Sequence, residues 1–289
     1  MYIKKSILSF ALITSLYGVG YANAETNVQS DPVAPITNVA TNVKVSGLDH
    51  VELRSQIKKY FNNKDVISHI AETPIKNAYL VSLDDGTSFV FFKDSNYAIL
   101  GDMYDLTDKS NITPELKADF YKKILDKYPV ASGIHYEPTV DKIGTAYVFT
   151  DPTCGYCRKL HFEMQTYLDK GIEVIYIPYP RSGMEGQGHD ELVDVFNSGD
   201  DAGKKEAMNL AKQDKAQDIK SLPTYKESPK GTELVNEGVE IGRELGIRGT
   251  PSIYLENGYN IPGYTDAESL AKTILKQKEL ASNSVKKAQ

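Results

Sequence analysis

The stretch "TAYVFTDPTCGYCRKL" (145–160) contains both cysteines of the chain, Cys154 and Cys157, and decides the fold. Residues 145–151 are typical of a buried strand that runs directly into the cysteines. Residues 157–171 then predict a helix, and the apolar run "IEVIYIPYP" predicts another strand. This order of strand, Cys-X-X-Cys, helix and strand predicts an α/β unit with the cysteines at the start of its helix.

The first residues of the chain have the three parts of a secretory signal peptide. Lys4 and Lys5 form a short positive start, an apolar run follows, and the triplet "ANA" supplies the small residues at a cleavage site. We expect residues 1–24 to be removed, with cleavage after Ala24. The apolar run is short for a membrane span, which needs about 20 residues.

Composition narrows the function classes. The whole chain of 289 residues has a formal net charge of −6, which argues against nucleic acid or an anionic membrane surface as partner. Export points to an oxidising compartment, where cysteines usually form structural disulfides. A chain of this length builds its core without such staples, and a bridge across so short a loop constrains the unfolded chain weakly. A structural role for the pair is therefore disfavoured.

The N-terminal part predicts a small α+β domain. Residues 48–60 have apolar positions at helical spacing, and strand candidates follow at 78–83, 87–92 and 97–106. The turn "DDG" between the first two strands is a hairpin signal. Such a sheet has little core and exposed edges, so we interpret the domain as a dimerisation module. A lid packed on the same chain is the alternative.

Two further helices and a hairpin complete the pattern. Residues 113–128 predict a connecting helix, with Thr113 as N-cap and Pro114 at its first position. The charged region 185–237 has few apolar residues and predicts two or three helices, and a hairpin turns at "NG" before the closing helix. The predicted organisation is signal peptide 1–24, flexible lead-in 25–43, dimerisation domain 44–107, linker helix 108–129, catalytic domain 130–280 and tail 281–289.

The position of the Cys pair favours redox chemistry. Cys154 lies at a helix N-terminus, where unpaired N–H groups and the helix dipole stabilise a thiolate and lower the thiol pKa. Cys157 lies one turn further on the same face and could attack a mixed disulfide held on Cys154. We therefore predict Cys154 as the exposed nucleophile and Cys157 as the more buried resolving thiol. Gly155 and Tyr156 are expected to tune the thiolate and the turn.

Two structural roles for the cysteines are the alternatives. Cys154, Cys157 and His161 have a spacing that could suit zinc, but no second Cys-X-X-Cys or His-X-His supplies further ligands. An inert disulfide is the other. We expect neither a metal nor a cofactor, and we interpret His161 as an ordinary helix residue.

A proline later in the chain strengthens the redox hypothesis. In "RGTPSIY", Pro251 stands at the start of a strand that follows a helix. X-Pro bonds are the ones that readily become cis. We predict a cis Thr250–Pro251 bond that faces the Cys pair, with Thr250 offering its N–H and C=O to an extended client peptide.

These motifs resemble the bacterial periplasmic DsbC/DsbG family of disulfide isomerases. The matching pieces are "LGDMYDL", "FTDPTCGYCRKLH", "YIPYPRSG", "LGIRGTPSIYLENG" and "IPGY", in the family's order, over about residues 44–280. The sequence Cys-Gly-Tyr-Cys matches the DsbC side. The resemblance implies a thioredoxin-like domain with a helical insertion, a V-shaped homodimer that holds misfolded exported proteins, and a membrane electron donor of the DsbD type. The structural disulfide that DsbC carries in the insertion is missing here.

The sequence as a whole predicts a periplasmic thiol:disulfide interchange protein. It would isomerise or reduce wrong disulfides through the redox-active pair Cys154–Cys157, with chaperone-like holding of its clients. One alternative is a DsbA-like net thiol oxidase, and another is a non-catalytic assembly chaperone.

Overall fold

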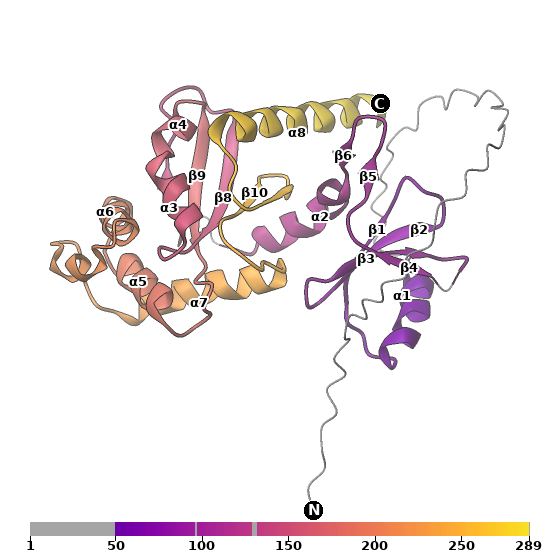
Figure 1. Cartoon of the computed structure of the whole chain (residues 1–289), viewed down its shortest axis with the longest axis horizontal. Helices are drawn as coiled ribbons and strands as arrows, with labels where there is room; N and C mark the ends of the chain where they lie inside the picture. The colour runs from indigo at the N-terminus through magenta and orange to yellow at the C-terminus, as the bar shows by residue number, and fades with distance from the viewer. Residues whose placement is uncertain (1–49, 96, 129–131, 289) are drawn as a thin grey trace, which may run out of the picture. The chain divides into compact units, whose positions relative to one another are not determined.

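The computed structural model describes residues 50–95, 97–128 and 132–288. The predicted signal peptide and the lead-in lie outside the described residues. Two main sheets and the helices packed on them account for the fold (Figure 1).

The N-terminal sheet is small and fully antiparallel, with the order β1-β2-β3-β4. Its elements are α1 (Val51–Lys58), the 3-10 turn η1 (Lys59–Phe61), β1 (Ile67–Glu72), β2 (Ala78–Leu83), β3 (Ser88–Phe92) and β4 (Ala98–Leu100). Leu53 and Ile57 of α1 pack on Val81 and Phe91 of the sheet. The predicted helix and the DDG hairpin are confirmed, whereas β1 escaped prediction because "ISHIAE" places a histidine between its apolar residues.

The third predicted strand, 97–106, is interrupted. Only β4 extends the sheet, because Gly101 adopts a φ of 134° and ends the strand. Residues beyond it form a separate two-stranded ribbon of β5 (Tyr104–Asp105) and β6 (Ser110–Asn111). The segment therefore leaves a short edge strand in place of a long one.

Helix α2 (Thr113–Leu125) lies where the linker helix was predicted. It begins one residue earlier than expected. Thr113 is already helical, and its hydroxyl accepts the N–H of Met103 instead of capping the helix. Its residues Leu116, Ile124 and Leu125 are buried, so α2 is a packed helix and more than a connector.

The second sheet has the order β11-β10-β8-β9-β7. Its strands are β7 (Ile134–Tyr136), β8 (Gly144–Thr150), β9 (Ile172–Pro178), β10 (Ser252–Leu255) and β11 (Asn260–Pro262). β8 and β9 run parallel, as the strand-helix-strand pattern predicts, and the other neighbouring pairs are antiparallel. The hairpin β10–β11 turns at Asn257–Gly258, as expected.

Side chains alternate along the strands and build a core on each face of this sheet. One cluster joins Val148, Val174 and Ile253 to the helices within 155–168, to the insertion and to the closing helix. The other joins Phe149, Ile177 and Tyr254 to α2 and to the helix over 229–244. The near-continuous apolar character of β8 and β9 follows from burial on both faces.

The remaining helices differ from prediction in their ends. They are α3 (Gly155–Phe162), α4 (Met164–Leu168), α5 (Gln187–Phe196), α6 (Asp201–Lys212), the 3-10 helix η3 (Ala216–Ser221), α7 (Pro229–Glu244) and α8 (Ala267–Ala288). The helix predicted over 157–171 starts earlier and breaks at Glu163. The closing helix, predicted to end at Leu280, continues to Ala288, since no Gly or Pro stops it.

Candidate active site

Cys154 caps the helix that carries the pair. It is the N-cap residue of α3, with extended backbone angles of φ −87° and ψ 123°. Its own N–H donates to the Asp151 carbonyl at 3.1 Å, which holds the preceding turn, and its carbonyl accepts the N–H of Arg158 at 3.0 Å. The free backbone N–H groups of the first helical turn therefore point toward its sulfur.

The two thiols have opposite acidities. A hydrogen bond from the Cys157 thiol, together with the backbone N–H groups of Cys157 and Tyr156, lowers the pKa of Cys154 to about 5 against the opposing effect of burial. Burial and the same hydrogen bond raise the pKa of Cys157 well above its ordinary value. Both cysteines are free thiols in this structure. The arrangement favours a thiolate on Cys154 and a protonated Cys157 at neutral pH.

The expectation that Cys154 is exposed is wrong. Only 4% of Cys154 is exposed, against 1% of Cys157, so both residues are buried. The cause is a neighbouring loop, because the Cys154 sulfur lies 3.2 Å from the Thr250 carbonyl oxygen. The next residue, Gly155, borders open space, since an added Cβ there would meet no atom within 4 Å.

The structure brings Thr250 and Pro251 to the cysteines, as predicted. The Thr250–Pro251 peptide bond is cis, which confirms the prediction. In this structure the Thr250 carbonyl faces the Cys154 thiol, so that oxygen is not turned toward an open groove. The buried Thr250 hydroxyl lies near both sulfurs and helps to lower the pKa of each thiol.

Tyr156 forms an aromatic surface beside the pair. It is 63% exposed, and its ring stacks on Tyr264 with the ring centroids 6.1 Å apart. The Lys159 ammonium lies 4.3 Å from the centre of the Tyr264 ring. Sequence spacing could not reveal Tyr264 as a neighbour, because it comes from the loop after β11.

A buried carboxylate anchors the turn before Cys154, and sequence reasoning missed it. Asp151 accepts hydrogen bonds from the N–H and hydroxyl of Thr153 and from the backbone and side chain of Arg181. Burial opposes the charge, but these donors hold the pKa of Asp151 below its ordinary value. The signal was present in "FTDPTC" and "YPRSG", which stand at the ends of two neighbouring parallel strands.

The residues around His161 do not support the zinc alternative. His161 is buried, its Nε2 lies 2.7 Å from Asn209 Oδ1, and its Nδ1 lies 3.3 Å from the Tyr176 hydroxyl. Burial lowers the pKa of His161 to about 4, so the ring is neutral at neutral pH. Both ring nitrogens are thus engaged inside the domain. His161 is a helix residue, as expected, and its ring lies in the core.

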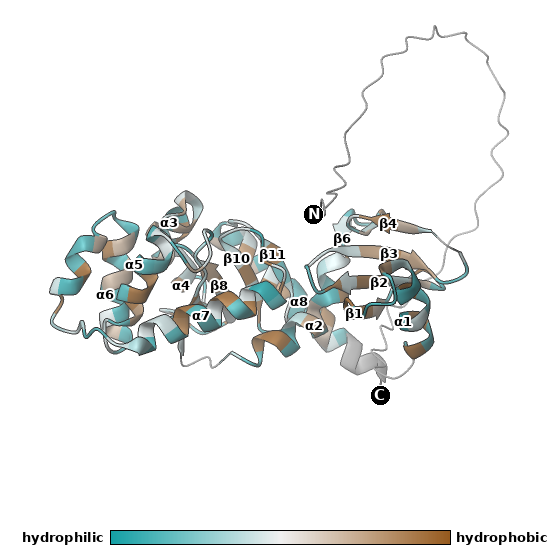
Figure 2. Ribbon diagram, turned by 90° about the horizontal axis from the view of Figure 1, so that it is seen from below, coloured by the Kyte–Doolittle hydropathy of each residue, from teal (hydrophilic) through white to brown (hydrophobic). Residues whose placement is uncertain are grey.

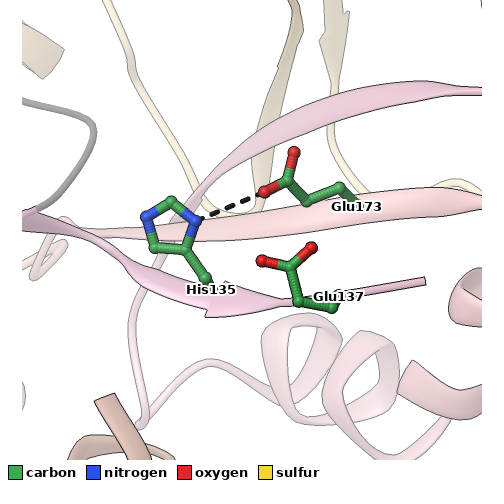
Figure 3. Close-up of side chains that lie close together, drawn as sticks. All are labelled: His135, Glu137 and Glu173. Atoms are coloured by element: carbon green, nitrogen blue, oxygen red, sulfur yellow. Dashed lines mark hydrogen bonds and ion pairs between the residues drawn. The ribbon is translucent and has the colours of Figure 1, made fainter. Parts of the chain in front are cut away.

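Another group of ligand-type side chains lies at the β7 edge of the sheet (Figure 3). His135 of β7, Glu137 just after it and Glu173 of β9 place one nitrogen and two oxygens within 4.8 Å of one another. Glu173 already accepts hydrogen bonds from Lys142 and Thr145 and pairs with His135. The Lys142 ammonium therefore balances the buried charge, and the group is explained as an ion-pair network.

Known proteins resemble this chain in sequence. A family model described as a thioredoxin-like domain matches residues 134–278. The thiol:disulfide interchange protein DsbC of Salmonella typhimurium is 31% identical over 199 residues, which cover 68% of this chain and 76% of the relative. DsbC of Haemophilus influenzae is 28% identical over 74% of this chain and 85% of the relative.

The chain belongs to the DsbC/DsbG family. It is accordingly a thiol:disulfide interchange enzyme with a thioredoxin-like fold, and its partners contain disulfides. Among solved structures, DsbG of Helicobacter pylori is 17% identical and covers 70% of this chain and 98% of its own, with a TM-score of 0.39. In the present chain, none of the helices within the described residues has the length and apolar character of a membrane span.

Proposed function

We propose that this protein isomerises and reduces wrong disulfides in exported proteins, with Cys154 as the attacking thiol. The observation that carries the proposal is the contrast between two neighbouring thiols at the start of α3, since the pKa of Cys154 is lowered and the pKa of Cys157 is raised. A thiol is a nucleophile only as its thiolate, and the pKa of about 5 at Cys154 supplies a thiolate at neutral pH.

The exchange proceeds as a series of sulfur displacements. The Cys154 thiolate attacks one sulfur of a client disulfide, a Cys154–client bond forms, and the other client sulfur leaves as a thiolate. That client thiolate can attack a different disulfide of the client, and the thiolate freed there attacks the client sulfur bound to Cys154, which forms a new client disulfide and returns Cys154 as a thiolate. If the client stalls, Cys157 loses its proton, attacks Cys154 and releases the reduced client. Cys157 therefore limits how long a client stays bound.

The surroundings of the pair suit an unfolded client chain. Tyr156 and Tyr264 offer exposed aromatic faces beside Cys154, and Gly155 leaves the approach open. We propose that Thr250 and Pro251 line the place where an extended client peptide binds. The Thr250 carbonyl would exchange its contact with the Cys154 thiol for one with the client once the thiol is deprotonated.

We further propose that the N-terminal sheet is a dimerisation domain. β4 pairs with β3 on one side only, and its residues Ile99 and Leu100 are 59% and 74% exposed. β4 is strongly hydrophobic in Figure 2 and borders an apolar cavity of about 320 Å³. The cavity is lined by Ile57, Tyr60, Phe61, Leu83, Thr87, Phe89, Phe91, Ala98 and Leu100. An exposed apolar edge strand is a template for a second copy of the chain.

The setting of this activity is proposed from the sequence. Removal of the predicted signal peptide, residues 1–24, would place the mature protein in the periplasm, where new disulfides form. An isomerase works from the dithiol state, so it needs a reductant that keeps Cys154 and Cys157 reduced. A membrane electron donor of the DsbD type would supply it.

Reactivation of scrambled, multi-disulfide ribonuclease tests the proposal. The reduced protein should restore ribonuclease activity, and Cys154→Ala should restore none because no mixed disulfide can form. Cys157→Ala should accumulate covalent complexes with the substrate on non-reducing gels. Reactivation by the Cys154→Ala variant would contradict the catalytic role and favour the assembly chaperone. Rapid oxidation of reduced ribonuclease without reactivation of the scrambled form would favour a net oxidase.

A further inference from the structure

A fully buried lysine lies beneath the turn that carries the cysteines. Lys212, the last residue of α6, is 1% exposed. Its Nζ donates to the Thr150 hydroxyl at 2.6 Å and to the Asp151 carbonyl at 3.1 Å. The same Asp151 carbonyl accepts the N–H of Cys154. Lys212 is therefore bonded directly to the backbone that sets the position of the pair.

The hydrogen-bond partners of Lys212 do not neutralise its charge. A hydroxyl and a carbonyl accept its two bonds, and neither is ionised. The nearby Asp151 carboxylate is occupied by Thr153 and Arg181. A buried ammonium is costly unless a negative group compensates it. Among the described residues, the acidic groups that favour the Lys212 ammonium are Cys157, Asp151 and Cys154, and Cys157 has the largest effect of the three on the pKa of Lys212.

We propose that the Lys212 ammonium is the buried counter-charge of the Cys157 thiolate and thereby sets the rate at which Cys157 releases a client from Cys154. The inference rests on the proposed roles of the two cysteines. Lys212 acts through Cys157 and is a positioning residue. Nothing in the sequence around Lys212 indicated this, because the residue comes from the divergent insertion.

The release step shows where the charge is needed. Cys157 gives its proton to solvent, and its thiolate attacks Cys154 while the Cys154–client bond breaks. The Cys154–Cys157 disulfide forms, and the client sulfur leaves with the electron pair. During this step Cys154 is in the mixed disulfide and carries no charge. Cys157 must therefore ionise in a buried place, and Lys212 is the largest influence that lowers its pKa.

Lys212 itself titrates in an accessible range. Burial lowers the pKa of Lys212 to about 8, so the counter-charge is present below pH 8 and disappears above it. Its other neighbours titrate elsewhere. Burial lowers the pKa of His161 to about 4 and raises the pKa of Tyr176 well above 10, and the pKa of Asp151 is held below its ordinary value. Arg158 faces the same region and is paired with Asp214. A change near pH 8 in the release step therefore reports on Lys212.

Stopped-flow reaction of the reduced protein with DTNB measures the release step directly. Cys154 releases the first thionitrobenzoate, and Cys157 releases the second when it displaces the mixed disulfide. We expect the rate of the second release to rise with pH and to bend to a lower slope where Lys212 loses its proton, at or below its pKa of about 8 in the reduced protein, because the mixed disulfide carries no charge on Cys154. A straight profile from about pH 6 to pH 10, two units on either side, would overturn the inference.

Lys212→Met separates charge from packing, because methionine has a similar unbranched chain and no charge. We expect its profile to be straight, lower than wild type below pH 8, and merged with wild type above about pH 9. The deficit should be about threefold for each unit by which the Cys157 pKa rises, since the gain in thiolate nucleophilicity offsets part of the loss. An equal deficit at every pH would mean a packing role and would contradict the inference.

Lys204→Met is the matched control. It removes the same charge from the same helix, where Lys204 lies over the Phe196 ring. This variant should keep the bend and the wild-type rate. If Lys212→Met fails to fold, as judged by circular dichroism, the wild-type profile still decides the matter. Persistence of the second release in Cys157→Ala would instead refute the proposed function, which keeps the two failures distinct.

Discussion

At the scale of single residues, the chemistry depends on a few hydrogen bonds around two sulfurs. Cys154 and Cys157 are three residues apart and both are buried, yet their pKa values move in opposite directions. The thiol with backbone N–H groups aimed at it becomes acidic, and the thiol without them becomes a donor. Orientation relative to the helix N-terminus, and not exposure, distinguishes the two cysteines.

Alkylation tests the assignment of the attacking thiol. Iodoacetamide at mildly acidic pH should modify Cys154 first, and the rate should follow a titration with a midpoint near the Cys154 pKa of about 5. Peptide mass spectrometry after brief labelling identifies the modified cysteine. Cys154→Ser serves as the control and should label only at alkaline pH. Earlier labelling of Cys157 in the wild-type protein would reverse the assigned roles.

The acidity of Cys154 also predicts how stability depends on pH. An unfolded cysteine has a pKa of about 8.5, whereas folded Cys154 has a pKa of about 5. A group whose pKa is lowered by folding stabilises the native state fully above its unfolded pKa, and this stabilisation is lost as pH falls toward the folded pKa. The raised pKa of Cys157 changes stability only above the unfolded pKa of about 8.5, so it adds no pH dependence below that pH. The reduced protein should therefore lose stability between about pH 8.5 and pH 5.

Urea denaturation of the reduced protein across this range provides the measurement. Cys154→Ser is the reference, because it lacks the titrating thiol and keeps the rest of the site. The difference in unfolding free energy between the two proteins should shrink as pH falls. A difference that stays constant would mean that the Cys154 pKa is not lowered by folding.

At the scale of elements, helix α7 packs closely on the end of β9. A Cβ on Gly242 would collide with the Tyr179 ring, and one on Gly238 would collide with the Pro178 carbonyl. The Tyr179 ring is fixed by a hydrogen bond from its hydroxyl to the Ile247 carbonyl at 2.9 Å. Glycine inside a helix costs up to about 1 kcal/mol relative to alanine. These two glycines therefore lower the intrinsic stability of the helix, but they allow α7 to lie close to the sheet.

Helix propensity alone predicts that replacing Gly242 with alanine stabilises the protein, but we expect this substitution to destabilise it. We predict that Gly242→Ala lowers the unfolding free energy by about 1–3 kcal/mol, because the methyl group overpacks the contact with Tyr179. Urea unfolding followed by far-UV circular dichroism measures it. Glu240→Ala, at an exposed position of α7, is the control and should change stability by less than about 0.5 kcal/mol. A stabilised Gly242→Ala variant would show that α7 moves away from the sheet at little cost.

At the scale of the whole molecule, the proposed dimer combines two kinds of surface. The catalytic domain has a closed core on both faces of its sheet, whereas the N-terminal sheet leaves an apolar edge uncovered at β4. Simultaneous contacts from two catalytic sites would hold a client longer than one site. We therefore expect isomerase activity to require the proposed dimer and simple reduction to need only one copy.

Charged substitutions on the edge strand β4 should lower isomerase activity without changing the reactivity of Cys154. Ile99→Asp combined with Leu100→Asp should give a monomer in sedimentation velocity, because two carboxylates oppose pairing of the strand. We expect isomerase activity on scrambled ribonuclease to fall several-fold and Cys154 alkylation to stay at the wild-type rate. Val140→Asp, an exposed apolar position in the other domain, is the control and should remain dimeric. A dimeric edge variant would place the interface elsewhere.

Local patterns in the sequence determined the fold class and most of the candidate site. The strand before the cysteines, their three-residue spacing and the Asn257–Gly258 turn act within a few residues, so each can be recognised without tertiary contacts. The Cys-X-X-Cys motif and the later Thr250–Pro251 also follow in a fixed order. Their meeting follows from that order, since β10 pairs with β8. The helix ends were less predictable, as the break at Glu163 and the extension of α8 show.

Only the tertiary structure decided how deeply the thiols are buried and which charges surround them. Thr250 closes over Cys154 from 96 residues away, Arg181 holds Asp151 from the next strand, and Lys212 arrives from an inserted helix. Burial and electrostatic fields depend on distance in space, and they sum contributions from every element packed around a sulfur. Spacing along the chain contains no record of those distances, so the sequence alone specified a reactive cysteine pair, and the packed fold specified the environment that controls it.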